Sequence, residues 1–387
     1  RNRLKHKPSL GNMTGSTLNI ALQNASNSST VYAYITGQAI DNNNALVIMQ
    51  ADGKTPYYPS SPSSTGQPLA QNCAIPLGAP GSTATVTVPR ISASRIWFVF
   101  DDTLTFLLNP GPGLVEPSIS NQSDPNYNKN WGFAEFTFNA DQLYANISYV
   151  DFVSIPLSMT LLNAAGNTQY VSGIPSDGLA TISNALIAQN QSDGAGWDQL
   201  VISNNGSVLR AVSPNNGIVL NNSLFSTYYT AYVDAVYAKY SSTPLSIDTQ
   251  ASFGVVQGTV SGSTLTFPSV GSFTKPSTAD IFSNSSGPFT TSTPGMAGLT
   301  PRLAAAFNRT TLLIDSTQPS TDVSAFYANN PTNHYSRIVH ATNLDKRGYA
   351  FPYDDVQATG GADQSGAVSD GNPQLLTFAV GGIGAHT

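Results

Sequence analysis

Residues 131–139 read WGFAEFTFN, and this stretch is the strongest indicator of the fold class. On a β-strand, successive side chains point to opposite faces of the sheet. One face of this strand would carry Ala134, Phe136 and Phe138. The opposite face would carry Glu135, Thr137 and Asn139. The apolar face belongs in a core, and the polar face must meet water or a ligand.

The same alternation of apolar and polar residues recurs from Ser16 to about Leu161 and predicts further strands. These segments are STLNIALQN (16–24), VYAYITGQA (31–39), ALVIMQADG (45–53), TATVTVPR (83–90), RIWFVFDD (95–102) and ANISYVDFVSIPLSM (145–159). Turns rich in Pro, Gly and Ser separate them, such as NPGPG at 109–113. We therefore expect a mainly β fold that begins as an antiparallel sandwich or barrel.

Helical spacing replaces this alternation near Pro175. Helices are predicted in SDGLATISNALIAQ (176–189), STYYTAYVDAVYAKYSS (226–242) and TPRLAAAFNRTTLL (300–313). In the last of these, Thr300 would be the N-cap and Pro301 the first helical residue. Strand-like residues 251–268 lie between the second and third helices. The resulting domain prediction is a β domain of residues 1–174 and 340–387, with a mixed α/β domain of residues 175–339 inserted into it.

Composition restricts the possible ligands. Lys, Arg, Asp and Glu total 38 of 387 residues, with a formal net charge of −6. Nucleic-acid binding depends on clustered cations and is not expected. No run of 18 apolar residues is present, so no membrane span is expected. The 17 Tyr and 17 Phe, together with abundant Ser, Thr and Asn, suit a neutral polyhydroxylated ligand.

Metal and cofactor sites are not expected either. Cys73 is the single cysteine, which rules out an intrachain disulfide or a cysteine-based zinc site. His334 and His340 are six residues apart, which is not the i, i+4 spacing of a helical metal pair. No Walker A loop or dinucleotide-binding motif follows a predicted strand. The sequence thus predicts chemistry performed by side chains alone.

Two carboxylates are candidates for that chemistry. Only two glutamates occur among the 22 acidic residues, Glu116 and Glu135, and Asp151 follows Glu135 by sixteen positions. If Asn139 and Ile147 closed a hairpin, Glu135 and Asp151 would be directly opposed and would face the same side. Glycosidic cleavage requires such a pair, one acid protonated and one ionised. The alternative is two acids on a solvated sheet face.

Several uncommon strings in this chain, taken together and in order, resemble glycoside hydrolase family 64. They are RIWF (95–98), NPGPGLVEPS (109–118), SDPN (123–126), WGFAEFTFN (131–139) and ISYVDFVSIPL (147–157). This is a β-1,3-glucanase family that includes laminaripentaose-producing enzymes, and the likeness is greatest to its fungal branch. The resemblance implies a thaumatin-like β domain, a mixed α/β domain and a wide groove between them. YAFPYDD (349–355) also resembles a late segment of thaumatin-like proteins, although the thaumatin disulfides are missing.

Roles for individual residues follow from this resemblance. Glu135 would be the general acid and Asp151 the general base of an inverting mechanism. Thr137 and Asn139 would contact substrate, and Tyr144 stands where the family has a stacking Trp. Inverting enzymes keep their carboxyls about 6.5–9.5 Å apart, whereas opposed strand residues have Cβ atoms about 4.5–5.5 Å apart, so the hairpin pairing conflicts with this role.

Three further residues are candidates for substrate binding. Trp131 would either stack on a sugar ring or belong to the core. Asp354 and Asp355 would either line the groove or cap a turn.

The functional expectation is therefore a secreted, monomeric endo-β-1,3-glucanase that releases short laminari-oligosaccharides from β-1,3-glucan without a cofactor. The alternative is a non-catalytic thaumatin-like glucan-binding protein of the cell wall, because fold alone does not fix function. Low charge and a high content of Ser, Thr and Asn favour a secreted, wall-associated glycoprotein, although several of the ten N-x-S/T sequons must arise by chance in such a chain.

Overall fold

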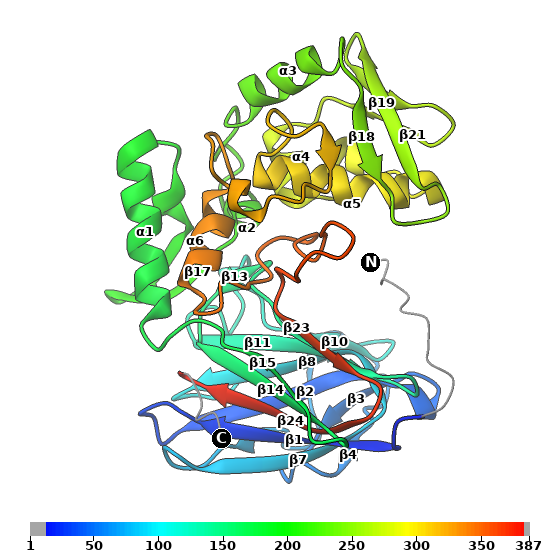
Figure 1. Cartoon of the computed structure of the whole chain (residues 1–387). Coiled ribbons are helices and arrows are strands. Elements are labelled where there is room, and N and C mark those ends of the chain that lie inside the picture. Colours follow the sequence, from blue (N-terminus) through cyan, green and yellow to red (C-terminus); the bar gives the residue numbers. More distant parts are fainter. Residues whose placement is uncertain (1–12, 383–387) are drawn as a thin grey trace.

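The alternating segments pair into two stacked sheets, which form the lower half of the molecule in Figure 1. The structure, a computed structural model, describes residues 13–382. The first sheet has the order β15-β14-β24-β1-β7, with bounds Thr168–Val171, Leu157–Asn163, Pro373–Val380, Thr17–Asn24 and Thr83–Pro89. The fold is therefore mostly β, as predicted.

The second sheet has eight strands and carries the WGFAEFTFN segment. Its order is β23-β12-β11-β8-β2-β3-β4, and β6 also pairs with β2. The bounds, in that order and with β6 last, are Ala367–Asp370, Leu143–Ile147, Asn130–Phe138, Ile91–Phe100, Val31–Ala39, Ala45–Met49, Pro56–Tyr57 and Ile75–Pro76.

The core between these sheets forms from the face that the alternation predicted. Ala134, Phe136 and Phe138 of β11 are buried. Phe98 of β8 lies 6.2 Å, between ring centroids, from Phe378 of β24 in the other sheet. The opposite face of β11 is consequently directed away from the sandwich.

The alternation predicted an antiparallel sandwich, but the first sheet also contains a parallel strand pair. β1 and β24 run parallel, with Asn19 paired to Leu375. The last strand returns after the whole α/β segment and enters the sheet between β1 and β14. The predicted single strand at 145–159 is also interrupted. It divides into β12, a loop, the short β13 (Phe152–Val153) and β14, because residues 148–151 leave the sheet.

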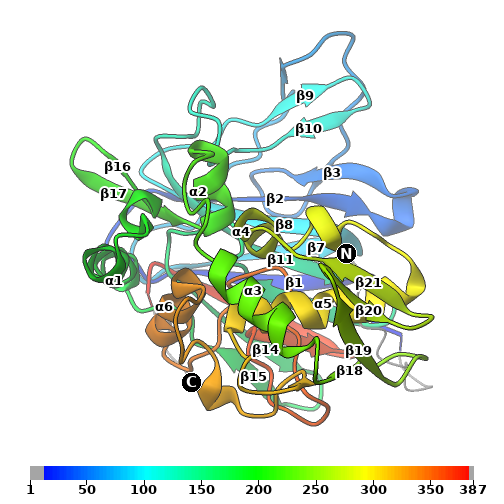
Figure 2. The same ribbon diagram turned by 90° about the horizontal axis from the view of Figure 1, so that it is seen from above.

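Helices and two small sheets lie above the eight-stranded sheet (Figures 1 and 2). The helices α1 to α6 have bounds Gly178–Asp193, Pro214–Leu220, Thr230–Lys239, Thr278–Ser283, Pro294–Arg309 and His334–Thr342. One sheet has the order β21-β20-β19-β18-β22, with bounds Gly271–Thr274, Thr264–Phe267, Val255–Ser261, Leu245–Asp248 and Thr317–Gln318. The other, β13-β17-β16, adds Ser207–Val212 and Val201–Asn204 to β13.

The helix predicted at 300–313 begins earlier than expected. α5 starts at Pro294, and the Thr293 side chain accepts a hydrogen bond from the backbone N–H of Met296. Pro301 lies inside the helix rather than at its first position. The Thr293-Pro294 pair supplies the same start signal as Thr300-Pro301, one Thr-Pro step earlier in the chain.

The predicted domain boundaries at residues 174/175 and 339/340 stay a prediction. Across the first of them, β17 of the inserted segment pairs with β13 of the β segment that precedes it. Strands β9 (Leu107–Asn109), β10 (Gly113–Val115) and β5 (Gln67–Pro68) form a further small sheet of the β part. Within residues 13–382, no helix combines the length and apolar character needed to cross a bilayer.

Candidate active site

The outward face of β11 changes from aromatic to polar along the strand. Trp131 and Phe133 are buried, and their rings contact Trp97 of β8 at centroid distances of 5.7 and 5.2 Å. The next residue on this face, Glu135, keeps 27% of its side chain exposed. The candidate site therefore begins where the aromatic cluster ends.

Trp131 belongs to the core, which corrects its candidacy as a sugar-stacking residue. Its ring is 1% exposed, and its Nε1–H donates to the carbonyl oxygen of Asn126. The guanidinium of Arg210, from β17, lies 5.8 Å from the ring centroid. With Arg210 over the ring, the buried Trp131 offers no exposed surface to a sugar.

Arg95 lies beside Glu135 on the neighbouring strand. The two residues are directly paired between β8 and β11, and their side chains approach to 3.4 Å (Nη2 to Oε1). Nη1 of Arg95 donates a hydrogen bond of 2.9 Å to Oε2 of Glu116. Both glutamates of the chain therefore contact one guanidinium.

The partner of Glu135 on the other side is Asn146, not Asp151. β11 and β12 pair Glu135 with Asn146, Thr137 with Tyr144 and Phe138 with Leu143. The predicted hairpin register was wrong because Asn139 closes a tighter turn. Its Oδ1 accepts hydrogen bonds from the backbone N–H groups of the two residues that end the turn, Asp141 and Gln142.

This turn also determines what Asn139 can do. Its side-chain oxygen Oδ1 is used within the hairpin, and the substrate contact expected of Asn139 stays a prediction. Thr137, by contrast, is buried on the same face as Glu135 and directly opposite Tyr144.

Tyr144 connects Glu135 to the late loop that includes Tyr349 and Asp355. Burial raises the pKa of Tyr144 to about 12, and the negative charges of Asp355, Asp363 and Glu135 act in the same direction. Burial also raises the pKa of Asp355, against the hydrogen bond that the carboxylate receives from Tyr349. The predicted residues Glu135, Tyr144 and Asp355 are thus brought together.

Asp354, one residue earlier, has a different set of partners. Its carboxylate is fully buried and pairs with Arg309 at 3.2 Å and His340 at 2.8 Å. Oδ2 also accepts from the backbone N–H of Ala350. Asp354 therefore joins α5, α6 and the late loop, and its candidacy as a substrate contact is corrected.

His340 is charged in this network. Nδ1 faces the carbonyl oxygen of Lys346 at 2.9 Å, and Nε2 faces Oδ2 of Asp354 at 2.8 Å. Both neighbours are acceptors, so both ring nitrogens carry protons. Burial lowers the pKa of His340, but the Asp354 carboxylate overrides this, and the net pKa is raised above its usual 6.5.

Replacing Asp354 with Ala is expected to lower the free energy of unfolding by about 3–5 kcal/mol, because it leaves two buried cations without their carboxylate. The control is Asp234→Asn, which breaks the exposed Lys275 ion pair and should cost under about 1 kcal/mol. Urea unfolding of both variants measures the difference. Equal losses would contradict a structural role for Asp354.

The same network predicts how stability depends on pH. A pKa raised in the folded state means that charged His340 stabilises the fold fully below its unfolded pKa of about 6.5. This contribution is lost as the pH rises through the folded-state pKa. In the His340→Gln variant, the free energy of unfolding should therefore fall less above pH 6.5 than in the wild type, because the variant has no imidazolium charge to lose. A wild-type and a variant curve of the same shape would contradict this.

Asp151 reaches the site from the loop between β12 and β13. Its backbone carbonyl accepts from Ser213 N–H at 2.9 Å and from Asn216 Nδ2 at 3.2 Å, and its Oδ1 lies 3.4 Å from the same Asn216 nitrogen. Ser213 is the N-cap of α2. The α/β part thus holds Asp151, whereas the sheet holds Glu135.

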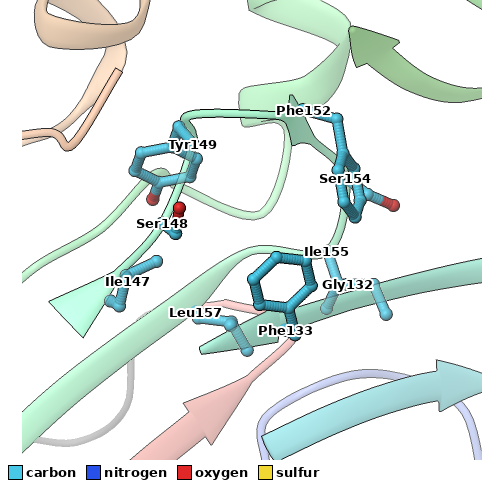
Figure 3. A pocket seen from close by; sticks show the side chains of 9 residues that line it. All are labelled: Gly132, Phe133, Ile147, Ser148, Tyr149, Phe152, Ser154, Ile155 and Leu157. Carbon is cyan, nitrogen blue, oxygen red and sulfur yellow. The ribbon is translucent and has the colours of Figure 1, made fainter. Parts of the chain in front are cut away.

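Figure 3 shows how this loop covers β11. Phe152, next to Asp151, packs against the rings of Trp131 and Phe133 at 5.1 and 5.7 Å. Residues of this loop and of β11 line a small, mainly apolar pocket, which is a packing feature and not a sugar site. Asp151 therefore precedes a residue, Phe152, that packs on the face of β11 that bears Glu135, and β11 pairs Glu135 with Asn146 rather than with Asp151. Glu135 and Asp151 are thus not held at the short spacing of directly opposed strand residues.

Comparison with known proteins gives the family. The sequence profile described as Beta-1,3-glucanase, that of glycoside hydrolase family 64, matches residues 16–380. The chain belongs to this family. It is similar to the "Glucan endo-1,3-beta-glucosidase" proteins of Cellulosimicrobium cellulans and Arthrobacter sp. (strain YCWD3), at 30% identity over 301 residues in each case. These matches cover 75% of this chain and 52% of each relative, so the family-64 chain spans about half the length of the curated relatives it matches.

A solved structure is similar over nearly the whole length. A laminaripentaose-producing beta-1,3-glucanase crystallised with laminaritetraose matches with a TM-score of 0.83 and 29% identity. The alignment covers 94% of this chain and 98% of that one. A family-64 domain from Clostridium beijerinckii, at 21% identity and a TM-score of 0.73, shares the fold. The organisms named for these relatives are bacterial, so the likeness to the fungal branch stays a prediction. The likeness to thaumatin also stays a prediction.

Several site residues of this family-64 chain were missed by sequence reasoning. Tyr349 and Asn216 contact Asp355 and Asp151, yet each comes from a distant part of the chain. Arg95 was not among the predicted site residues, and the structure shows that its partners are the two glutamates. The rarity of Glu in the sequence was the one available signal for this cluster. Within residues 13–382, no group of three His, Cys, Asp or Glu is arranged to hold a metal ion.

Proposed function

We propose that the chain is an endo-β-1,3-glucanase that cleaves β-1,3-glucan into short laminari-oligosaccharides with inversion at the anomeric carbon. The observation that supports this proposal is that Phe152, the residue after Asp151, packs on Trp131 and Phe133, which share the face of β11 that bears Glu135. Family membership and the laminaritetraose complex of the similar glucanase support a β-1,3-linked glucan as substrate.

In the proposed reaction, Glu135 protonates the glycosidic oxygen and Asp151 accepts a proton from the attacking water. The water enters on the face of the anomeric carbon opposite the leaving sugar, and the carbon–oxygen bonding electrons pass to the protonated leaving oxygen. No cofactor takes part. Thr137, Tyr144 and Asp355 are proposed to contact the sugars beside the cleavage point, because they lie next to Glu135 on this face.

The anomer of the first product tests the mechanism. Proton NMR during the first minutes of hydrolysis of a linear β-1,3-glucan should show the α-anomer before mutarotation. An initial β-anomer would contradict inversion while leaving hydrolysis intact. Binding of the polymer without any product would instead favour the non-catalytic glucan-binding protein.

We further propose that the protein acts outside the cell as a monomer. The low charge supports this, as do the exposed sequons at Asn27, Asn121, Asn205 and Asn221. Four other sequon asparagines, Asn24, Asn146, Asn284 and Asn308, are buried and cannot carry a glycan in this fold. The Asn12 sequon lies outside the described residues. Peptide mass mapping of secreted protein should find glycans at exposed sequons, and glycans at the buried ones would contradict the structure.

A further inference from the structure

The two glutamates of the chain converge on Arg95 in an unequal way. Nη1 of Arg95 hydrogen-bonds Glu116 at 2.9 Å, whereas Nη2 lies 3.4 Å from Glu135. The Glu116 side chain is 41% exposed, and those of Arg95 and Glu135 are 22% and 27% exposed. The shorter contact therefore belongs to the glutamate that has no proposed part in the chemistry.

Aromatic rings fix the position of the guanidinium. Its central carbon lies 4.3 Å from the centroid of Phe133 and 5.3 Å from that of Trp97. A guanidinium over aromatic faces is attracted by the ring quadrupole, and its planar fork can serve two carboxylates at once. Arg95 is thus held at the boundary between the aromatic cluster and the polar site.

Charge counting shows what Glu116 contributes. With both glutamates ionised, the three side chains carry a net charge of −1, and one added proton brings the sum to zero. A lone arginine beside an acid favours the ionised acid, which would oppose proton donation. A second carboxylate beside the arginine offsets part of this effect.

We propose that Arg95 and Glu116 form a positioning pair for the general acid. Glu116 neutralises Arg95 while Glu135 is protonated, and the second nitrogen of Arg95 stabilises Glu135 once it has become a carboxylate. The inference rests on the proposed function and assigns both residues a role through Glu135, with no contact to substrate.

The step is balanced in protons and electrons. The O–H bond of Glu135 breaks as its proton moves to the leaving sugar oxygen, and the carboxylate that remains gains Arg95 as its counter-ion. Asp151 takes the proton of the attacking water. A later proton transfer from Asp151 through solvent to Glu135 restores the starting state.

Other ionisable groups near Glu135 come from every element around it. Tyr144 of β12 lies on the same face, and Asp355 and Asp363 of the late segment act on Tyr144. Asp151, the proposed base, lies on its own loop beside Asn216. None of these is altered by changes at Arg95 or Glu116, so the comparison of variants isolates the positioning pair.

The test is the pH dependence of kcat/KM for hydrolysis of a soluble laminari-oligosaccharide. Loss of the protonated acid sets the alkaline limb of such a profile. In Glu116→Gln, unshielded Arg95 should move this limb toward acid by about one pH unit, and in Arg95→Met the limb should move toward alkaline by about the same amount. Arg95→Lys and Glu116→Asp keep the charges and should retain a limb near that of the wild type.

Opposite shifts in the two charge-removing variants would support the pair. Lower activity at all pH values with an unmoved limb, in variants whose thermal unfolding resembles the wild type, would overturn the inference and leave a structural role. Wild-type protein that releases no sugar would instead overturn the proposed function. The two failures are therefore distinguishable.

Discussion

Glu135→Gln is expected to lower kcat on linear β-1,3-glucan by roughly 10³-fold, because general acid catalysis contributes about 10²–10⁴. Gln keeps the shape of the side chain but has no proton to give to the glycosidic oxygen. Rates of reducing-sugar release for the wild type and the variant measure the loss. Pull-down of insoluble glucan should show that the polymer is still bound.

A substrate with an activated leaving group makes this test specific. A nitrophenyl laminari-oligoside releases an anion that needs little protonation, so Glu135→Gln should lose far less activity on it than on the glucan. Asp234→Asn, which alters an exposed acid on α3 that is paired with Lys275, is the control and should behave as the wild type on both substrates. Equal losses on both substrates would contradict the role of Glu135 as an acid.

Asp151→Asn is expected to lower kcat by a similar factor of roughly 10³, but on both substrates. Activation of water is required whatever the leaving group, so a nitrophenyl substrate does not bypass the missing base. The Asn216 contact and the backbone hydrogen bonds of residue 151 can persist in this variant, which keeps the loop in place.

Azide provides the matching rescue. It attacks without losing a proton, so it should restore turnover of Asp151→Asn and yield a glycosyl azide of α configuration. The same azide should not restore Glu135→Gln on the glucan. Formation of a β-azide, or no rescue at all in a folded variant, would contradict the assignment of Asp151 as general base.

Much of the sheet architecture follows from the sequence. Period-two alternation correctly separated the core face of β11 from the face that bears Glu135 and Thr137, because burial of one sheet face imposes that pattern directly. The helix signals for α1 and α3 were also correct in type. These features depend on residues close together in the chain.

Features that depend on distant contacts could not be predicted. Trp131 is covered by Arg210 and Phe152, which no local pattern around residue 131 indicates. Asp354 and Asp355 are adjacent in sequence, yet one is buried between two cations while the other lies beside Tyr144. Such a difference depends on which elements pack on each side of the loop.

The hairpin register shows a subtler limit. The side chain of Asn139 forms hydrogen bonds that tighten the turn, and this changes the partner of Glu135 from Asp151 to Asn146. An alternation pattern predicts which face of the sheet a side chain occupies, but not which residue lies opposite it on the next strand. It therefore could not predict this pairing partner.

The most direct test of the account is mass analysis of soluble products after incubation of a linear β-1,3-glucan with the wild type and, separately, with Glu135→Gln. We predict laminari-oligosaccharides from the wild type alone, while both proteins sediment with the polymer. Sedimentation of the wild type without any soluble product would contradict the central claim that this chain hydrolyses the glucan.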